Sequence, residues 1–349
     1  MEYEAIIDRM LDNMPETQDT RESTVAYQIL AAAAVEIKNA YDLNDVTNKE
    51  TFADTATMEG LTRRALERGL KPKESTQAIL KAVFDIEIPI GSRFFYDELT
   101  YIATEKIEDF SYKLICEQSG DIGNSHIGEI IPIQSIEKLS SAKITEVLIP
   151  GEDEESEEDF RKDYYDSFNN ISYGWNKAMY KTYVDGLQGV GGVLVLPHTN
   201  GNLETQGGHV ALIIESSTYG VPSQELIANV KNILDPTDGN GDGAVSIDHC
   251  VHCIGCGKTV VNVESSFTYE TGYNFAMLKD AIEKTIDDYF LSLNKLWEDE
   301  QVIVRIAKLE SALIGIKGIL DVSDTKLNGN TTSLTIDRNN IVERGVVSG

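Results

Sequence analysis

Cysteine is scarce in this sequence. The chain has 349 residues and only four cysteines, Cys116, Cys250, Cys253 and Cys256. A fold that is held together by disulfides is usually shorter and much richer in cysteine, so we expect this fold not to depend on them. Three of the four cysteines lie between residues 250 and 256, which marks that segment as a local cluster.

Positive charge is also scarce. The chain has 30 Lys and Arg against 58 Asp and Glu, which gives a formal net charge of −28 at pH 7. Phosphate backbones repel such a chain unless its few cations cluster, and the sequence has no such cluster, so we expect no nucleic-acid partner. Any tight contact between copies of this chain must bury apolar surface or concentrate cations locally.

Long apolar runs are missing. A helix that spans a bilayer needs about 20 apolar residues, and runs such as residues 29–35 are short and rich in alanine. Residues 1–15 are acidic and amphipathic, whereas a secretory signal starts with positive charge and continues with an apolar stretch. We therefore expect no membrane partner and assembly in a bacterial cytoplasm.

What is present indicates a multidomain α+β protein. Periodicity and composition divide the chain into a helical N-terminal region (residues 1–75), a β-rich domain (76–150), an α/β domain after an acidic hinge (151–260) and a C-terminal α+β domain (261–349). The fold class that we expect is an N-terminal helical segment, a small β domain and C-terminal α/β sandwich domains.

The N-terminal region predicts three helices, with the longest at residues 22–44. Apolar residues recur in it at the spacing of one helix face, and most such faces pack against their own domain. We therefore expect this stripe to be core. Its members are Val25, Ile29, Ala33, Ile37, Ala40 and Tyr41.

Two segments predict strands and turns. The alternation of Ala78, Leu80, Ala82 and Phe84 with other residues predicts a strand, which the isoleucines up to Ile90 continue. Near the end of the chain, residues 319–336 predict a hairpin, because Asn-Gly-Asn at residues 328–330 suits a tight reversal.

Several stretches together resemble the baseplate J-like family of contractile phage tails and tail-like particles. The resemblance extends from about residue 55 to residue 342. It includes an acidic Gly-x-Asp-Glu-Glu run and a Gly-rich loop at residues 235–258. The similar stretches are Ile88-Pro89-Ile90-Gly91, Tyr101-Ile102-Ala103-Thr104, Gly120-Asp121-Ile122-Gly123-Asn124, residues 151–161 and Val190-Gly191-Gly192-Val193.

The resemblance implies a structural role with no catalytic residues. It implies a wedge subunit in the baseplate of a phage or of a DNA-free tailocin, which pairs with itself and forms a sixfold ring around the hub. The implied partners are other wedge and hub proteins and proteins near the sheath. The implied action is to couple rearrangement of the baseplate to sheath contraction, through interfaces that switch between discrete states.

The Cys/His segment departs from the family pattern, which usually has an Ala-Pro-Ile-Gly-type stretch there. Thiolates and imidazoles at this density are typical zinc or iron–sulfur ligands. In a strand, however, Cys250 and Cys253 face opposite sides, and small buried thiols are the simpler interpretation. The candidate ligands are His249, Cys250, His252, Cys253 and Cys256.

A second candidate is a calcium loop. Asp238, Asn240 and Asp242 alternate with glycines as in the first half of such a loop. His249 occupies the twelfth position, where a carboxylate is expected, so a Gly/Asp-rich turn explains the composition equally well.

Two alternatives to the baseplate role remain open from sequence alone. One is a metal-binding protein or enzyme that uses the cysteine cluster, although catalysis also needs an open coordination position and an acid or base that we cannot name. The other is a tail-tip adhesion protein, which the helical N-terminal region and the lack of internal repeats disfavour.

Overall fold

The computed structural model describes residues 2–169 and 174–349 and shows a mixed α+β fold, as predicted. The chain divides into two compact units. The first comprises Met1–Lys73 and Glu155–Asn170, and the second comprises Glu74–Glu154 and Ile171–Gly349. The four-part division stays a prediction. Within the described ranges, no helix is long and apolar enough to cross a membrane.

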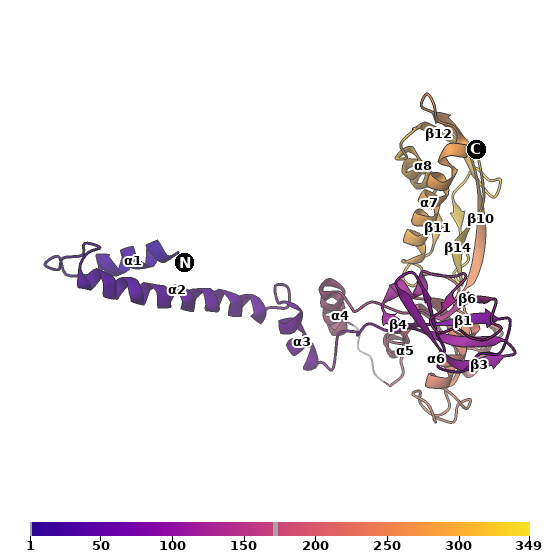
Figure 1. Ribbon diagram of the computed structural model, residues 1–349, viewed down its shortest axis with the longest axis horizontal. Coiled ribbons are helices and arrows are strands. Elements are labelled where there is room, and N and C mark those ends of the chain that lie inside the picture. The colour runs from indigo at the N-terminus through magenta and orange to yellow at the C-terminus, as the bar shows by residue number, and fades with distance from the viewer. Residues whose placement is uncertain (1, 170–173) are drawn as a thin grey trace. The chain divides into compact units, whose positions relative to one another are not determined.

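The first unit is helical. Its helices are α1 (Tyr3–Asp12), α2 (Val25–Thr51), α3 (Met58–Leu66) and α4 (Glu157–Asn169). Helix α2 begins at Thr24, whose side chain accepts a hydrogen bond from the backbone N–H of Tyr27, as N-cap residues do. Helix α1 lies along the N-terminal half of α2 (Figure 1), and the two helices share a small core. The fully enclosed members of that core are Ile6, Ile7 and Ala34.

Helices α3 and α4 form a second small core in this unit. Leu61 and Ala65 pack with Phe160 and Tyr164. The Arg161 guanidinium donates hydrogen bonds to the backbone carbonyls of Ala53 and Ala56, which precede α3. Because these carbonyls are fixed by an arginine of α4, segments about a hundred residues apart in the sequence form one unit.

The second unit begins with a six-stranded sheet in the order β5-β2-β3-β4-β1-β6. The predicted alternation in β1 is confirmed, because Ala78, Leu80, Ala82 and Phe84 are all buried. The prediction that Ile90 continues this strand is wrong: β1 ends at Phe84, and Ile90 lies in a turn, exposed. The elements are β1 (Gln77–Phe84), β2 (Arg93–Tyr96), β3 (Leu99–Glu108), β4 (Ser111–Ser119), η1 (Asp121–Asn124), β5 (Ile131–Pro132) and β6 (Ala142–Ile149).

A three-stranded sheet follows, in the order β7-β8-β9. Strands β7 (Val190–Thr199) and β8 (Thr205–Ser216) form an antiparallel hairpin. Strand β9 (Cys250–Gly255) pairs with β8 in parallel, and helix α6 (Gln224–Leu234) lies in the connection between them. Helix α5 (Lys177–Asp185) contacts β7, so both helices cover this sheet.

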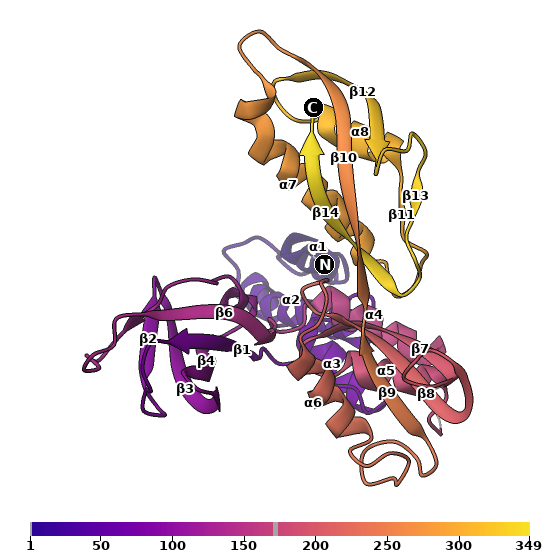
Figure 2. The same ribbon diagram turned by 90° about the vertical axis from the view of Figure 1, so that its right-hand side faces the viewer.

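The C-terminal part packs helices against a sheet in the order β12-β10-β14, and Figure 2 shows β10 beside β14. The tight reversal predicted at residues 328–330 is confirmed by the bridge between Leu327 and Asn330, but the predicted terminal hairpin is wrong. Strand β12 pairs with β10 instead. After the turn that follows Leu327, the chain continues into β13, which pairs with β11 and not with β12. The elements are β10 (Gly257–Tyr269), α7 (Phe275–Asn294), β11 (Ile303–Val304), α8 (Ile306–Ile314), β12 (Ile319–Leu327), β13 (Leu334–Thr335) and β14 (Asn340–Ser348).

Candidate functional site

The most unusual surface of the first unit is the uncovered side of α2. This helix has 27 residues, of which only Ala34 is fully buried among the described residues. All eight residues from position 42 to position 49 are exposed. A helix that is not covered by its own domain is normally stabilised by another chain or by many side-chain pairs along its surface.

Apolar residues gather on that uncovered side, which we call the α2 stripe. At about 100° per residue, positions 25, 29, 35, 43 and 46 fall within about 120° of one another, opposite the face that α1 covers. Isolated exposed apolar residues are ordinary, but a row along one helix face indicates a contact site. The α2 stripe comprises Val25 (71% exposed), Ile29 (64%), Val35 (46%), Leu43 (68%) and Val46 (55%).

The α2 stripe corrects one expectation from the sequence. The apolar face was expected to be core, but Val25 and Ile29 are exposed, whereas Ile37 and Tyr41 do pack against α1. Helix α2 carries two apolar faces and α1 covers only one of them. Sequence periodicity does not separate these faces, because both repeat at helical spacing.

The cysteine segment forms strand β9, so its side chains alternate between two faces. Val251 and Cys253 face the core beneath α6, while Cys250 and His252 take the other face. Cys256 follows the strand and is buried in the C-terminal core. The structure therefore does not bring the three cysteines together.

Burial also makes two of these thiols poor ligands. It raises the pKa of the Cys253 thiol to about 12 and that of the Cys256 thiol to about 12. The thiolate is the form that binds metal and attacks electrophiles, so both side chains behave as small apolar groups at neutral pH. Within residues 2–169 and 174–349, no three His, Cys, Asp or Glu side chains are grouped so that they could hold a metal ion.

The two candidate histidines make other contacts. A hydrogen bond of 2.7 Å joins His249 Nδ1 to the hydroxyl of Tyr180. A second bond of 2.7 Å joins His252 Nε2 to Nδ1 of His209 in the adjacent strand β8. Burial, followed by the neighbouring His209, lowers the pKa of His252.

The candidate calcium residues lie in a turn that a different carboxylate organises. Asp235 is fully buried and accepts hydrogen bonds from the backbone N–H groups of Gly239 (3.0 Å) and Val251 (2.9 Å). Lys231 pairs with both Asp235 (2.9 Å) and Asp238 (2.7 Å). Of the other candidates, Asn240 donates to Asp242. Asp238 thus already has a cationic partner, and the Gly/Asp-rich turn is explained without an ion.

A buried carboxyl group beside a partly buried one was not found by sequence reasoning. Glu215, at the end of β8, is 1% exposed, and burial, followed by the charge of Glu298, raises its pKa to about 8. Glu298 lies after α7, and its Oε2 is 3.3 Å from the ammonium group of Lys181 in α5. Burial raises the pKa of Glu298 as well. Nothing in the local sequence signals this meeting of β8, α5 and the segment after α7.

Two family models match the second unit. The model described as the baseplate J-like central domain matches residues 172–252. The model described as the baseplate J-like protein C-terminal domain matches residues 261–349.

Two similar proteins come from Bacillus subtilis strain 168. The uncharacterized protein YqbT is 31% identical over 352 residues, which cover 99% of this chain and 97% of YqbT. The phage-like element PBSX protein XkdT is 29% identical over 349 residues, which cover 99% of this chain and 96% of XkdT. Both similarities include the helical first unit as well as the segments that the family models match.

A solved structure of the anti-feeding prophage baseplate also overlaps with this chain. The overlap covers 98% of this chain and 89% of that one, at 9% sequence identity and a TM-score of 0.40. A likeness at this level carries no functional information.

Proposed function

Since this chain belongs to the baseplate J-like protein family and is a phage-tail baseplate protein, we propose that it is a structural wedge subunit of a contractile tail or tail-like particle. In this role it contributes to a ring around the central hub and holds the baseplate in the state that precedes contraction. The family resemblance that the sequence predicted is confirmed. The ring and the coupling to contraction are our proposal.

The observation that carries this proposal is the α2 stripe. Five exposed apolar side chains on one helix face are typical of a surface that another protein covers on assembly. We propose that a second copy of this chain covers it, so that two copies pair through their α2 helices. An apolar seam suits this pairing, because two chains with a net charge of −28 repel each other over most of their surfaces.

The division into two compact units supports the mechanical part of the proposal. The first unit has its own small cores and contributes its exposed helix, whereas the second unit contains the four sheets described above. A subunit with more than one folded unit can keep one interface while another rearranges. Contraction then corresponds to a change between two packed arrangements.

We propose that the chain acts without catalysis. The thiols of Cys253 and Cys256, which are the strongest chemical candidates in the sequence, are held in their protonated form by burial. The role that remains is to position partner proteins at the baseplate of the particle.

The test is electron microscopy of particles from a strain that lacks the gene for this chain. The expected result is free tubes, failed sheath assembly or particles without a baseplate, with normal particles restored by a plasmid copy of the gene. Intact contractile particles from the deletion strain would reject the proposal.

A further inference from the structure

Four of the chain's five histidines gather at one hollow in the second unit. His198, His209 and His249 line a cavity of about 270 Å³, and His252 is hydrogen-bonded to His209. Neither the baseplate role nor the family models assign anything to this hollow. His249 and His252, which the sequence suggested as metal ligands, instead form hydrogen bonds with Tyr180 and with His209.

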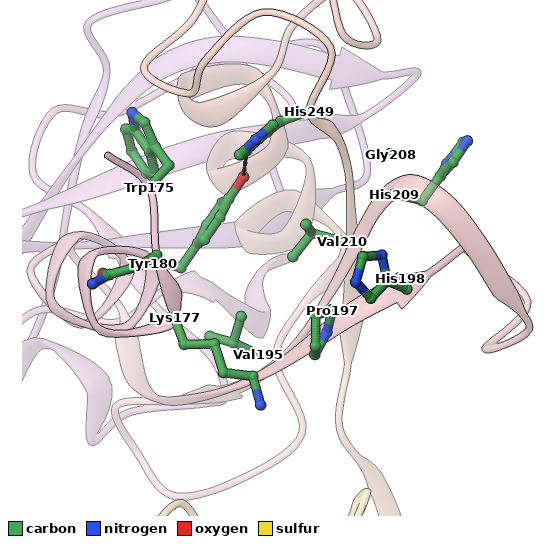
Figure 3. Close-up of a pocket in the computed structure, with 11 residues that line it drawn as sticks. Trp175, Lys177, Tyr180, Val195, Pro197, His198, Gly208, His209, Val210 and His249 are labelled. Atoms are coloured by element: carbon green, nitrogen blue, oxygen red, sulfur yellow. Dashed lines mark hydrogen bonds between the residues drawn. The ribbon is translucent and has the colours of Figure 1, made fainter. Parts of the chain in front are cut away.

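The walls of the hollow are mainly apolar and aromatic. Figure 3 shows Trp175, Tyr180 and His249 on one side and Pro197 and His198 on the other. The first group comes from α5 and the segments before α5 and β9, and the second comes from β7. Side chains of Val195 and Val210, on β7 and β8, complete the lining. These surfaces suit a planar apolar group.

The hollow differs in charge from the rest of the protein. Among the residues that the structure describes, no Asp or Glu lines the hollow, although the whole chain has 58 of them, and the exposed Lys177 is one of the lining residues. The charged groups near His252 are Lys231, Asp238 and Asp235, and the Lys231 ammonium pairs with Asp238 at 2.7 Å and with Asp235 at 2.9 Å. The exposed cation and the ring nitrogens of the lining complement a negatively charged group, since these carboxylates are held outside the lining by Lys231.

The donors are held in place by the fold. Tyr180 is buried, which raises the pKa of its hydroxyl, so the phenol stays protonated and its bond to His249 orients that ring. The indole of Trp175 lies 5.0 Å from the Tyr180 ring, centroid to centroid. Trp175 has a backbone φ of 57°, a conformation that bulky residues rarely adopt. A site with oriented walls loses less entropy when it is filled.

We propose that this hollow, the His/Trp pocket, binds an aromatic side chain that is flanked by a carboxylate on a partner protein. Its volume of about 270 Å³ is slightly below the roughly 300–1,000 Å³ of small-molecule sites, so it suits a single side chain. Aromatic side chains are the usual anchors of protein interfaces, and Lys177 supplies the partner for the carboxylate. The inference rests on the proposed function in one respect: the partner would be another baseplate protein.

The binding proposal can be tested directly on the full chain, because the chain contains two tryptophans and only one of them lines the pocket. Trp175 lines the pocket, and Trp297 is fully buried in the C-terminal core, so Trp297 serves as an internal reference. The chain is labelled with 5-fluorotryptophan and titrated with N-acetyl-tyrosine, and with N-acetyl-tyrosinamide as the uncharged control. We expect the acid to shift only the Trp175 fluorine signal and to bind about fivefold more tightly than the amide.

Two pairs of variants sharpen the test. Val210→Phe fills the hollow and should abolish the shift, whereas Val221→Phe, at an exposed position, should not. Lys177→Gln should remove the preference for the acid, and Lys308→Gln, also exposed, should keep it. An unchanged Trp175 signal at saturating probe, equal binding of acid and amide, or an equal shift of both signals would overturn the proposal.

The partner is identified by placing a photo-crosslinking benzoylphenylalanine at His198 and irradiating assembled particles. The expected product joins this chain to another baseplate protein at an aromatic residue next to Asp or Glu. If the chain is found in particles but only solvent adducts form, the partner assignment fails. If the chain is absent from particles, the proposed function fails, while the fluorine titration still decides whether the pocket binds its probe.

Discussion

Glu298, which follows helix α7, accepts a hydrogen bond of 3.2 Å from the backbone N–H of Val193 in strand β7. This bond joins the C-terminal part of the second unit to the sheet of β7, β8 and β9. Glu215 lies beside it, and Oε1 of Glu215 has no hydrogen-bond partner among the described residues. A buried carboxyl oxygen without a partner favours the protonated form, so we expect the contact between these segments to respond to pH.

Replacement of Glu215 by Gln should change how stability depends on pH. The pKa of Glu215 is raised from about 4.5 to about 8, so the folded state binds a proton that the unfolded state releases between these values. The contribution of Glu215 is therefore most favourable below about pH 4.5 and falls as the pH rises to 8. Glu215→Gln should equal the parent at pH 4 and exceed it by roughly 2–4 kcal/mol at pH 9.

Urea unfolding at the two pH values measures this difference. The matched control is Glu300→Gln. Because Glu300 is exposed, this replacement should leave the pH dependence of the unfolding free energy as it is in the parent. Parallel losses of stability with rising pH in the parent and in Glu215→Gln would show that the carboxyl is not the sensitive group.

Charge on the α2 stripe should prevent self-association. The double variant Leu43→Lys with Val46→Lys places two cations where the proposed partner helix packs, at side chains that are 68% and 55% exposed. Because these residues are exposed, the melting temperature should change little, whereas dimer formation should weaken by a factor of about 100 or more. Light scattering after size-exclusion chromatography measures the change.

The control for that experiment is Asn44→Lys with Asn48→Lys. It adds the same charges to the same turns of α2, but on positions outside the stripe. If both double variants dimerise equally, or if the parent chain is monomeric at all concentrations, the stripe is not a contact between copies.

Asp235 should be essential for the turn that precedes β9. It is fully buried and accepts two backbone N–H groups and the Lys231 ammonium, which lower its pKa against the opposing effect of burial. Asp235→Asn should destabilise the second unit by about 2 kcal/mol, because an amide nitrogen or a weaker acceptor then faces these donors. Asp242→Asn, on the exposed side of the same turn, should have almost no effect in the same thermal unfolding assay.

Purified chain should contain no stoichiometric metal. Cys250 and Cys253 face opposite sides of β9, and Cys256 is buried in another core, so a single ion cannot reach all three sulfurs. Elemental analysis should therefore give far less than one zinc or iron per chain, and a chelator should leave the melting temperature unchanged. One tightly bound metal per chain, lost together with stability on chelation, would reopen the metal-binding hypothesis.

Much of this protein follows from local sequence. The alternation from Ala78 to Phe84 is sufficient for β1, since a strand with one buried face has period two. The family motifs and the helical N-terminal region could also be predicted from the sequence, because they depend on residues close together in the chain. What failed locally was Ile90, because the strand already ends at Phe84 and Ile90 lies in a later turn, exposed.

Tertiary structure decided which faces are covered and which distant groups meet. The sequence of α2 defines its apolar residues, but only the packing of α1 separates a covered face from the α2 stripe. The pairing of β12 with β10, the meeting of Glu215 with Glu298 and the gathering of four histidines at one hollow join segments far apart in the chain. Periodicity reports what each segment would bury, whereas the path of the whole chain determines what lies against it.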